Sequence, residues 1–204
     1  YDRALLYLGL VHERGVGLAA DAARAAQLYE SAVKAGSAQA AWRLGLLHDR
    51  GAGVPKNLSR AREWFELAAS RGDPDALQTL GYYYRHGRGV EPDVHRAIQF
   101  FEKSAAAGNA RAQWSLGDLY LRGFEVDRNV PQGLRWLELA ADRGYVLALY
   151  DLARIQEQGR LVRRDMARAL ANYRIAAGRG YVLAQERLGD LLYEGVEAPP
   201  DLAE

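Results

Sequence analysis

The feature that most limits what this 204-residue chain can fold into is a repeat of 36 residues. Glycine and alanine columns keep the same step along the chain, so that several registers stay aligned without insertion or deletion. The clearest column is a Leu-Gly pair, at Leu8-Gly9, Leu44-Gly45, Leu80-Gly81, Leu116-Gly117 and Leu188-Gly189, with Leu152-Ala153 in the remaining place. A fixed period of this length predicts an array of equivalent structural units.

We predict a single repeat domain over residues 1–204, with Ala4 as the start of its first repeat. The predicted repeats are 4–39, 40–75, 76–111, 112–147, 148–183 and a partial sixth, 184–204. Because the chain stops halfway through this sixth repeat, we expect an apolar face at that end that a cap, a partner or a second copy covers.

Each repeat is predicted to form two helices. Ala41, Leu44 and Leu47 have the spacing of one buried helix face, which predicts a first helix over 40–50 that ends at Gly51. A second helix over 57–71 starts in a column of residues that favour the N-terminal cap of a helix. This column is Asp21, Asn57, Asp93, Asn129, Asp165 and Asp201. Neither helix could bury its apolar face alone, so neighbouring repeats must stack.

Small and large residues alternate in a way that fits close helix packing. Gly45 lies within the first helix, where glycine costs about 1 kcal/mol relative to alanine, a cost that makes sense where a facing helix comes close. Trp64-Phe65 supplies bulk beside it, whereas Asn172-Tyr173 loses half of this bulk. We therefore expect looser packing in the fifth repeat. The fold class predicted is all-α, an α-solenoid of stacked helix-turn-helix repeats.

The repeat resembles the Sel1-like repeat, a longer relative of the tetratricopeptide repeat. The matching residues within one repeat are Ala76, Leu80, Gly81, Tyr84, Gly87, Gly89, Val90, Asp93, Ala97, Phe101, Ala105 and Gly108. The resemblance covers essentially the whole chain and implies a right-handed superhelix. It also implies an adaptor that recruits other proteins in a bacterial envelope, secretion or signalling system, with a periplasmic or cell-envelope location.

By analogy with tetratricopeptide arrays, the first helix of each repeat is expected to line a concave groove. The candidate partner-binding residues are Trp42, Leu46, Arg50, Gln78, Tyr82, Arg85, Trp114, Asp118, Arg122, Tyr150 and Arg154. Aromatic and arginine side chains commonly carry the energy of interfaces, so a partner protein or peptide is the predicted ligand. The alternative is that Trp42 and Trp114 are structural and the polar members are only solvated.

Other classes of function have less support in the residues. The absence of cysteine excludes thiol catalysis and thiolate metal sites, and the net charge of +1 without a basic stripe argues against nucleic acid. His12 and His48 occupy a column that carries tyrosine at Tyr84 and Tyr120, so we interpret them as tyrosine substitutes rather than metal ligands. No nucleophile–base pair, cofactor motif or membrane span is present. We predict no enzyme; a carbohydrate- or peptidoglycan-binding module is the alternative, since aromatic faces also stack on sugars.

Two loops differ from the other repeats. Phe124 replaces a small or polar loop residue and is expected to be exposed. Arg160, Arg163 and Arg164 cluster in the loop of a fifth repeat that carries a charge of +4, before a final segment of charge −5. This cluster could contact an acidic partner, or the two charged segments could neutralise each other as neighbours.

Overall fold

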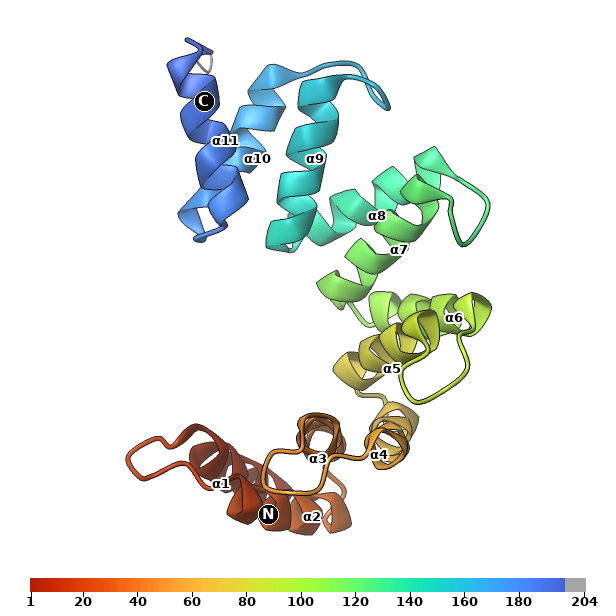
Figure 1. Ribbon diagram of the computed structural model, residues 1–204, viewed down its shortest axis with the longest axis vertical. Coiled ribbons are helices and arrows are strands. Elements are labelled where there is room, and N and C mark those ends of the chain that lie inside the picture. The colour runs from red at the N-terminus through yellow and green to blue at the C-terminus, as the bar shows by residue number, and fades with distance from the viewer. Residues whose placement is uncertain (197–204) are drawn as a thin grey trace. The chain divides into compact units, whose positions relative to one another are not determined.

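The computed structural model describes residues 1–196, which contain eleven α-helices and no strand (Figure 1). The all-α prediction is therefore confirmed for these residues. The helices are α1 (Asp2–Arg14), α2 (Ala22–Lys34), α3 (Ala38–Arg50), α4 (Leu58–Ser70), α5 (Pro74–His86), α6 (Val94–Ala106), α7 (Ala110–Arg122), α8 (Val130–Asp142), α9 (Val146–Gln158), α10 (Met166–Gly178) and α11 (Val182–Tyr193).

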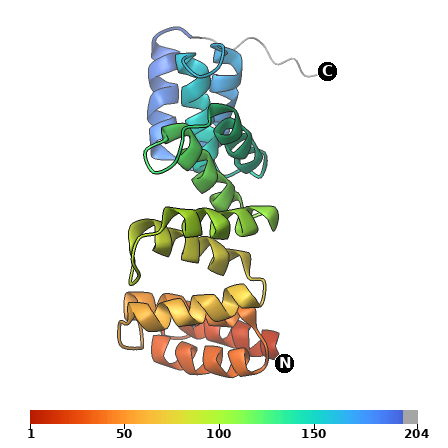
Figure 2. The same ribbon diagram turned by 90° about the vertical axis from the view of Figure 1, so that its right-hand side faces the viewer.

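The chain divides into two compact units. The first, Tyr1–Asn109, contains α1 to α6, and the second begins at Ala110 and contains α7 to α11. Within each unit, odd-numbered helices pair with the following helix as hairpins, and each hairpin packs on the next (Figures 1 and 2). In the second unit, for example, α9, α10 and α11 lie side by side. The predicted helix-turn-helix plan is thus present in both units.

The first helix of a repeat begins two residues before the predicted position. The Ser37 hydroxyl accepts a hydrogen bond from the Ala40 amide (3.3 Å), and the Asp73 carboxylate accepts one from the Ala76 amide (2.8 Å). These caps start α3 at Ala38 and α5 at Pro74. As a result the helices of a hairpin have equal lengths of 13 residues, rather than a short first and a long second helix.

The predicted caps of the second helices are confirmed wherever the structure describes them. Each side chain in the column accepts a hydrogen bond from the amide three residues later, at 2.8–3.1 Å. The capping residues are Asp21, Asn57, Asp93, Asn129 and Asp165, whereas Asp201 lies outside the described residues. Four first helices, α1, α3, α5 and α9, end at glycines with φ of 64° to 74°, the left-handed conformation that glycine adopts without strain.

The mid-helix glycines of α1, α3, α5 and α7 lie against the facing second helix, as the pattern predicts. A Cβ atom on Gly45 would stand 2.5 Å from Cε1 of the buried Phe65 ring, so only glycine allows this contact. The helices of the α7–α8 hairpin make this close contact differently, because Leu137 replaces the aromatic residue. Here Gly133 makes room for Leu121, whose Cγ would lie 2.7 Å from an added Cβ.

Candidate functional site

A hollow of about 180 Å³ opens between α7 and α9 of the second unit. We call it the α7–α9 hollow. Its principal lining residues are Asp118, Leu121, Arg122, Asp151, Arg154 and Ile155. Three of the predicted partner-binding residues, Asp118, Arg122 and Arg154, therefore come together in one concave surface. Leu121 and Ile155 supply apolar area between their charges.

Helical spacing places the charged groups of this hollow. Asp118 and Arg122 lie one turn apart on α7, and the Arg122 guanidinium donates a hydrogen bond to the Asp118 carboxylate. Asp151 and Arg154 face them from the second and third turns of α9. Each wall thus carries one acid and one base, which suits a ligand that itself carries both signs of charge or paired hydrogen-bonding groups.

A hydrogen bond from an indole N–H connects the two helices that wall the hollow. Trp114 Nε1 on α7 donates a hydrogen bond to Asp151 Oδ2 on α9 at 2.8 Å. Burial raises the pKa of the Asp151 carboxyl above its ordinary value, although the Trp114 bond and Arg154 act in the opposite direction. Trp114 is thereby fixed between successive first helices, in agreement with the structural alternative for this residue.

Tyr150 lies beside the hollow in a cluster of aromatic rings. Its ring meets Tyr181 edge to face at 5.0 Å and Tyr173 at 5.8 Å between centroids. The exposed Arg154 guanidinium lies 5.8 Å from the Tyr150 ring centre, a cation–π arrangement. The ring cluster gives Arg154 a rigid support, while the guanidinium itself stays accessible.

In the first unit the predicted residues are distributed between core and surface. Trp42 Nε1 donates to Thr79 Oγ1 (3.2 Å), which repeats the indole bond of Trp114. Tyr82 is 40% exposed and its ring packs on His86 at 4.4 Å. Gln78 is only 5% exposed, so its side chain offers little to a ligand.

The three remaining candidates of the first unit have graded exposure. Arg50 is exposed at the end of α3, and Arg85 is half-buried near the end of α5. Leu46 is half-buried and packs against the core cluster that contains Phe65 and Tyr83. Together with Tyr82, Arg50 and Arg85 are the members of this set that a partner could reach most readily.

Half-buried carboxylate clusters are a polar feature that was not predicted from the sequence. Tyr29 Oη donates to Glu13 Oε2 (2.5 Å), and Tyr173 Oη donates to Glu157 Oε2 (2.7 Å), in equivalent positions of repeats four apart. Arg43 lies 3.8 Å from Glu13, and Arg187 donates to Glu157. Glu13 and Glu157 share one column of the period with Asp49, and this acidic column was the available signal.

These clusters alter the acidity of their members. Burial and then the bond to Glu157 raise the pKa of the Tyr173 phenol. For Glu157, burial raises the pKa, but hydrogen bonds from Arg187 and Tyr173 outweigh it and lower the pKa overall. The carboxylate therefore stays charged at neutral pH and fastens α9 to α10 and α11.

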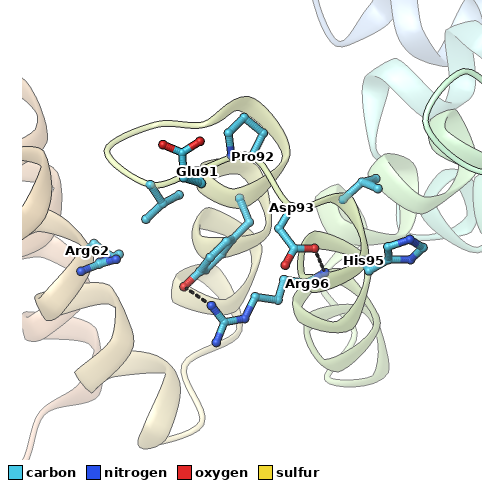
Figure 3. A pocket seen from close by; sticks show the side chains of 9 residues that line it. Arg62, Glu91, Pro92, Asp93, His95 and Arg96 are labelled. Atoms are coloured by element: carbon cyan, nitrogen blue, oxygen red, sulfur yellow. Dashed lines mark hydrogen bonds between the residues drawn. The ribbon is translucent and has the colours of Figure 1, made fainter.

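A second hollow, of about 510 Å³, lies at the loop between α5 and α6 in the first unit (Figure 3). Arg96 Nη1 donates to Tyr84 Oη (3.3 Å), while its backbone amide is capped by Asp93 (2.9 Å). Arg62 of α4 faces the loop from the other side. These hydrogen bonds form a helix cap and support the loop, and none of the predicted partner-binding residues lines the hollow.

The histidines are placed as the tyrosine-substitute interpretation expects. His48 is buried, with Nδ1 3.3 Å from the Pro55 carbonyl oxygen, and His12 is half-buried. Over residues 1–196 there is no group of three or more histidine, aspartate or glutamate side chains arranged to hold a metal ion. In the same residues no helix is both long enough and apolar enough to cross a membrane.

Stacked helical hairpins of constant length define an α-solenoid repeat protein. A family model described as "Sel1 repeat" matches residues 2–37, 38–73, 74–109, 110–145, 146–181 and 182–204. The chain therefore belongs to the Sel1 repeat family. The matched repeats start two residues before the predicted ones, in agreement with the observed helix starts. Sel1 repeats form a non-catalytic scaffold fold, and proteins that contain them generally mediate protein–protein interaction.

Solved structures of bacterial proteins are similar to this chain. A Sel1 repeat protein from Oxalobacter formigenes is 30% identical with a TM-score of 0.92, over 99% of this chain and 83% of that one. The protective antigen c5321 of uropathogenic Escherichia coli is 32% identical with a TM-score of 0.84, over 98% of this chain and 43% of that one. The immunity protein Pa5087 of Pseudomonas aeruginosa shares the fold at 24% identity and a TM-score of 0.64, over 90% and 67% of the two chains. A search of curated proteins gave no match.

Proposed function

We propose that this protein is a non-enzymatic scaffold that holds a segment of a partner protein on the surfaces formed by its first helices. The observation that supports the proposal most directly is the α7–α9 hollow, in which Asp118, Arg122 and Arg154 surround the apolar side chains of Leu121 and Ile155. An apolar floor with a few fixed polar groups is typical of sites that bind a ligand in one orientation. An extended or helical peptide could place an apolar side chain on this floor.

The first unit would add a second set of contacts. Tyr82, Arg50 and Arg85 are its most accessible predicted residues, and tyrosine and arginine are enriched among residues that dominate interface energies. Several weak contacts on one partner combine into a stronger one when the geometry allows simultaneous binding. We further propose a bacterial envelope, secretion or signalling system as the setting, because the similar structures are bacterial and the family resemblance implies such a system.

The glycan alternative has no specific support in the geometry. Stacking on a sugar needs an open aromatic face, whereas Trp42 and Trp114 are both half-buried and use their indole N–H groups inside the stack. We therefore keep peptide or protein as the proposed ligand class.

A capture experiment tests the proposal. The intact chain, immobilised, is compared with Tyr82→Ala/Arg154→Ala and with Arg135→Ala/Arg174→Ala, a matched double variant at exposed positions of second helices. We expect the first double variant to lose a bound protein that the intact chain and the matched variant both retain. Equal capture by all three proteins would show that the first-helix surfaces do not bind the partner. Binding to a glycan panel instead would favour the carbohydrate-binding alternative.

A further inference from the structure

The second unit has another hollow, on the side of α9 that faces the second helices, with a volume of about 520 Å³. We call it the α8–α10 hollow. The residues that matter for the argument are Ala141, Leu149, Leu152, Gln156, Asn172 and Ile175. Leu149 and Leu152 are almost fully buried and form an apolar floor, while the wall residue Ile175 is 45% exposed. Ile175 thus leaves apolar area exposed at the edge of the hollow, whose rim also carries charged side chains: Glu138, Asp142, Arg168 and Arg179.

The equivalent place in the first unit is filled by an indole. Three repeats earlier, the positions of Ala141, Leu149 and Leu152 are Val33, Ala41 and Leu44, which belong to one core cluster. Trp64 and Leu67, which correspond to Asn172 and Ile175, pack against this cluster. The hollow of the second unit is therefore the space that Trp64 occupies in repeat 2.

Repeat 3 gives an independent example with a different ring. Phe100, which corresponds to Asn172, packs against the cluster that contains Leu80, the counterpart of Leu152. Its ring also stacks on Tyr84, with centroids 5.5 Å apart and planes 16° from parallel. Repeats 2 and 3 of the first unit, each of which follows another repeat, thus both place an aromatic side chain at this point.

The residues at the open hollow form a polar edge over an apolar floor. Asn172 Nδ2 donates a hydrogen bond to Gln156 Oε1 at 3.0 Å, and both side chains are half-buried. Their remaining amide oxygen and N–H groups can pair with a polar group on a ring, such as an indole N–H. A volume of 520 Å³ lies within the roughly 300–1,000 Å³ range of sites that take small ligands.

We propose that the α8–α10 hollow is a docking site for an aromatic side chain, best a tryptophan, presented by a partner polypeptide. The ring takes the place that Trp64 and Phe100 fill in repeats 2 and 3, lies on Leu149, Leu152 and Ile175, and directs its N–H toward the amides of Asn172 and Gln156. This site is distinct from the first-helix surfaces proposed above, so either proposal can fail without the other.

The test uses N-acetyl-L-tryptophanamide as a probe, titrated into the full chain and followed by amide NMR shifts. We expect shifts confined to α8, α9 and α10, with weak binding by the intact chain. Asn172→Trp, which fills the hollow as Trp64 does in repeat 2, should weaken binding of the probe by roughly tenfold or more. Ile175→Lys, at an exposed position, provides a second variant with the same expected loss should Asn172→Trp alter the fold.

A reciprocal substitution in the first unit extends the test. Trp64→Asn should open the equivalent hollow in the first unit and add shifts in α2, α3 and α4. The proposal is overturned if the probe shifts no residue of the intact chain, or if Asn172→Trp and Ile175→Lys bind it as well as the intact chain does. Concentration-dependent self-association that Asn172→Trp abolishes, with no response to the probe, would also overturn it in favour of a second copy as the occupant.

Discussion

Repeat 2 and repeat 5, matched at residues 38–73 and 146–181, build the same hairpin and finish it differently. In repeat 2 the Trp64 indole packs on a core cluster, whereas in repeat 5 Asn172 bonds to Gln156 and leaves a hollow of about 520 Å³. Both repeats share a side-chain cap at the start of the second helix, Asn57 or Asp165, and a glycine at the end of the first helix, Gly51 or Gly159. A single column of the period therefore decides whether this place is core or accessible surface.

The interior of the two hairpins also differs. Phe65 in repeat 2 has no hydroxyl, and the nearby Asp49 instead accepts hydrogen bonds from Tyr83 and from Arg88. In repeat 5 the equivalent ring is Tyr173, which donates to Glu157 itself, and Arg187 completes the cluster. A half-buried carboxylate is kept in both repeats, but its partners come from different elements.

The largest expected effect comes from removing the ring of repeat 2. Trp64→Asn should lower the free energy of unfolding by about 3 kcal/mol, because it removes a packed indole and leaves a hollow like that of repeat 5. Denaturant unfolding combined with hydrogen exchange of α3 and α4 measures the loss and its place. Asn172→Trp is the reciprocal control and should slow exchange in α9 and α10. If Trp64→Asn left the free energy of unfolding unchanged, the difference in packing between the two repeats would not contribute to stability.

The next effect tests the glycine that faces the ring. Gly45→Ala should destabilise by about 2 kcal/mol, because the new Cβ would stand 2.5 Å from the Phe65 ring and force it to move. The same column already carries the buried Ala153 in repeat 5, so Ala153→Gly should cost only about 1 kcal/mol through helix propensity. Thermal unfolding of both variants gives the comparison. A Gly45→Ala variant more stable than the parent would show that Phe65 is not held in place.

A smaller effect is expected from the polar cluster of repeat 5. Glu157→Gln should lower stability by about 1–2 kcal/mol at neutral pH, since it weakens the hydrogen bonds from Tyr173 and Arg187. Because the pKa of Glu157 is lowered in the folded protein, the stabilisation is present above its ordinary pKa and is lost as the pH falls through the folded value.

Unfolding curves at several pH values check this prediction. The difference between the intact chain and Glu157→Gln should be constant near neutral pH and should shrink below about pH 4. Glu186→Gln, at an exposed position of α11, serves as the control and should change little. A difference that stayed constant into acid would mean that the charge of Glu157 adds nothing to the cluster.

The parts of this fold that could be predicted from the sequence are those with a local cause. The period, the paired helices and the caps such as Asn57 follow from residues within a few positions of one another. The exposure of Phe124 (88%) and the open packing beside Asn172 were also predictable, because Phe124 replaces a small or polar loop residue and Asn172 replaces the bulky residue found at Trp64.

The features that escaped prediction depend on contacts between helices. Tyr173 and Glu157 are 16 residues apart on α10 and α9, and Arg187 joins them from α11, so no local spacing indicates their cluster. The hydrogen bonds of Trp42 and Trp114 depend on residues 37 positions later in the next repeat. The start of the first helices was missed because its cap column mixes Ser37 and Asp73 with tyrosines, which make no side-chain cap bond.

The smallest expected effect concerns the indole bonds that hold successive first helices. Trp42 donates to the neutral Thr79, whereas Trp114 donates to Asp151, whose pKa is raised by burial. In the pH range between the ordinary and the raised pKa the folded chain binds more protons than the unfolded chain, so the charge of Asp151 lowers stability as the pH rises.

Asp151→Asn keeps an oxygen for the Trp114 N–H and removes this charge. We expect a gain in unfolding free energy of less than about 1 kcal/mol at neutral pH, which disappears in acid where Asp151 is protonated in both states. A loss of stability at neutral pH would show instead that the bonds of the charged carboxylate to Trp114 and its attraction to Arg154 outweigh its burial.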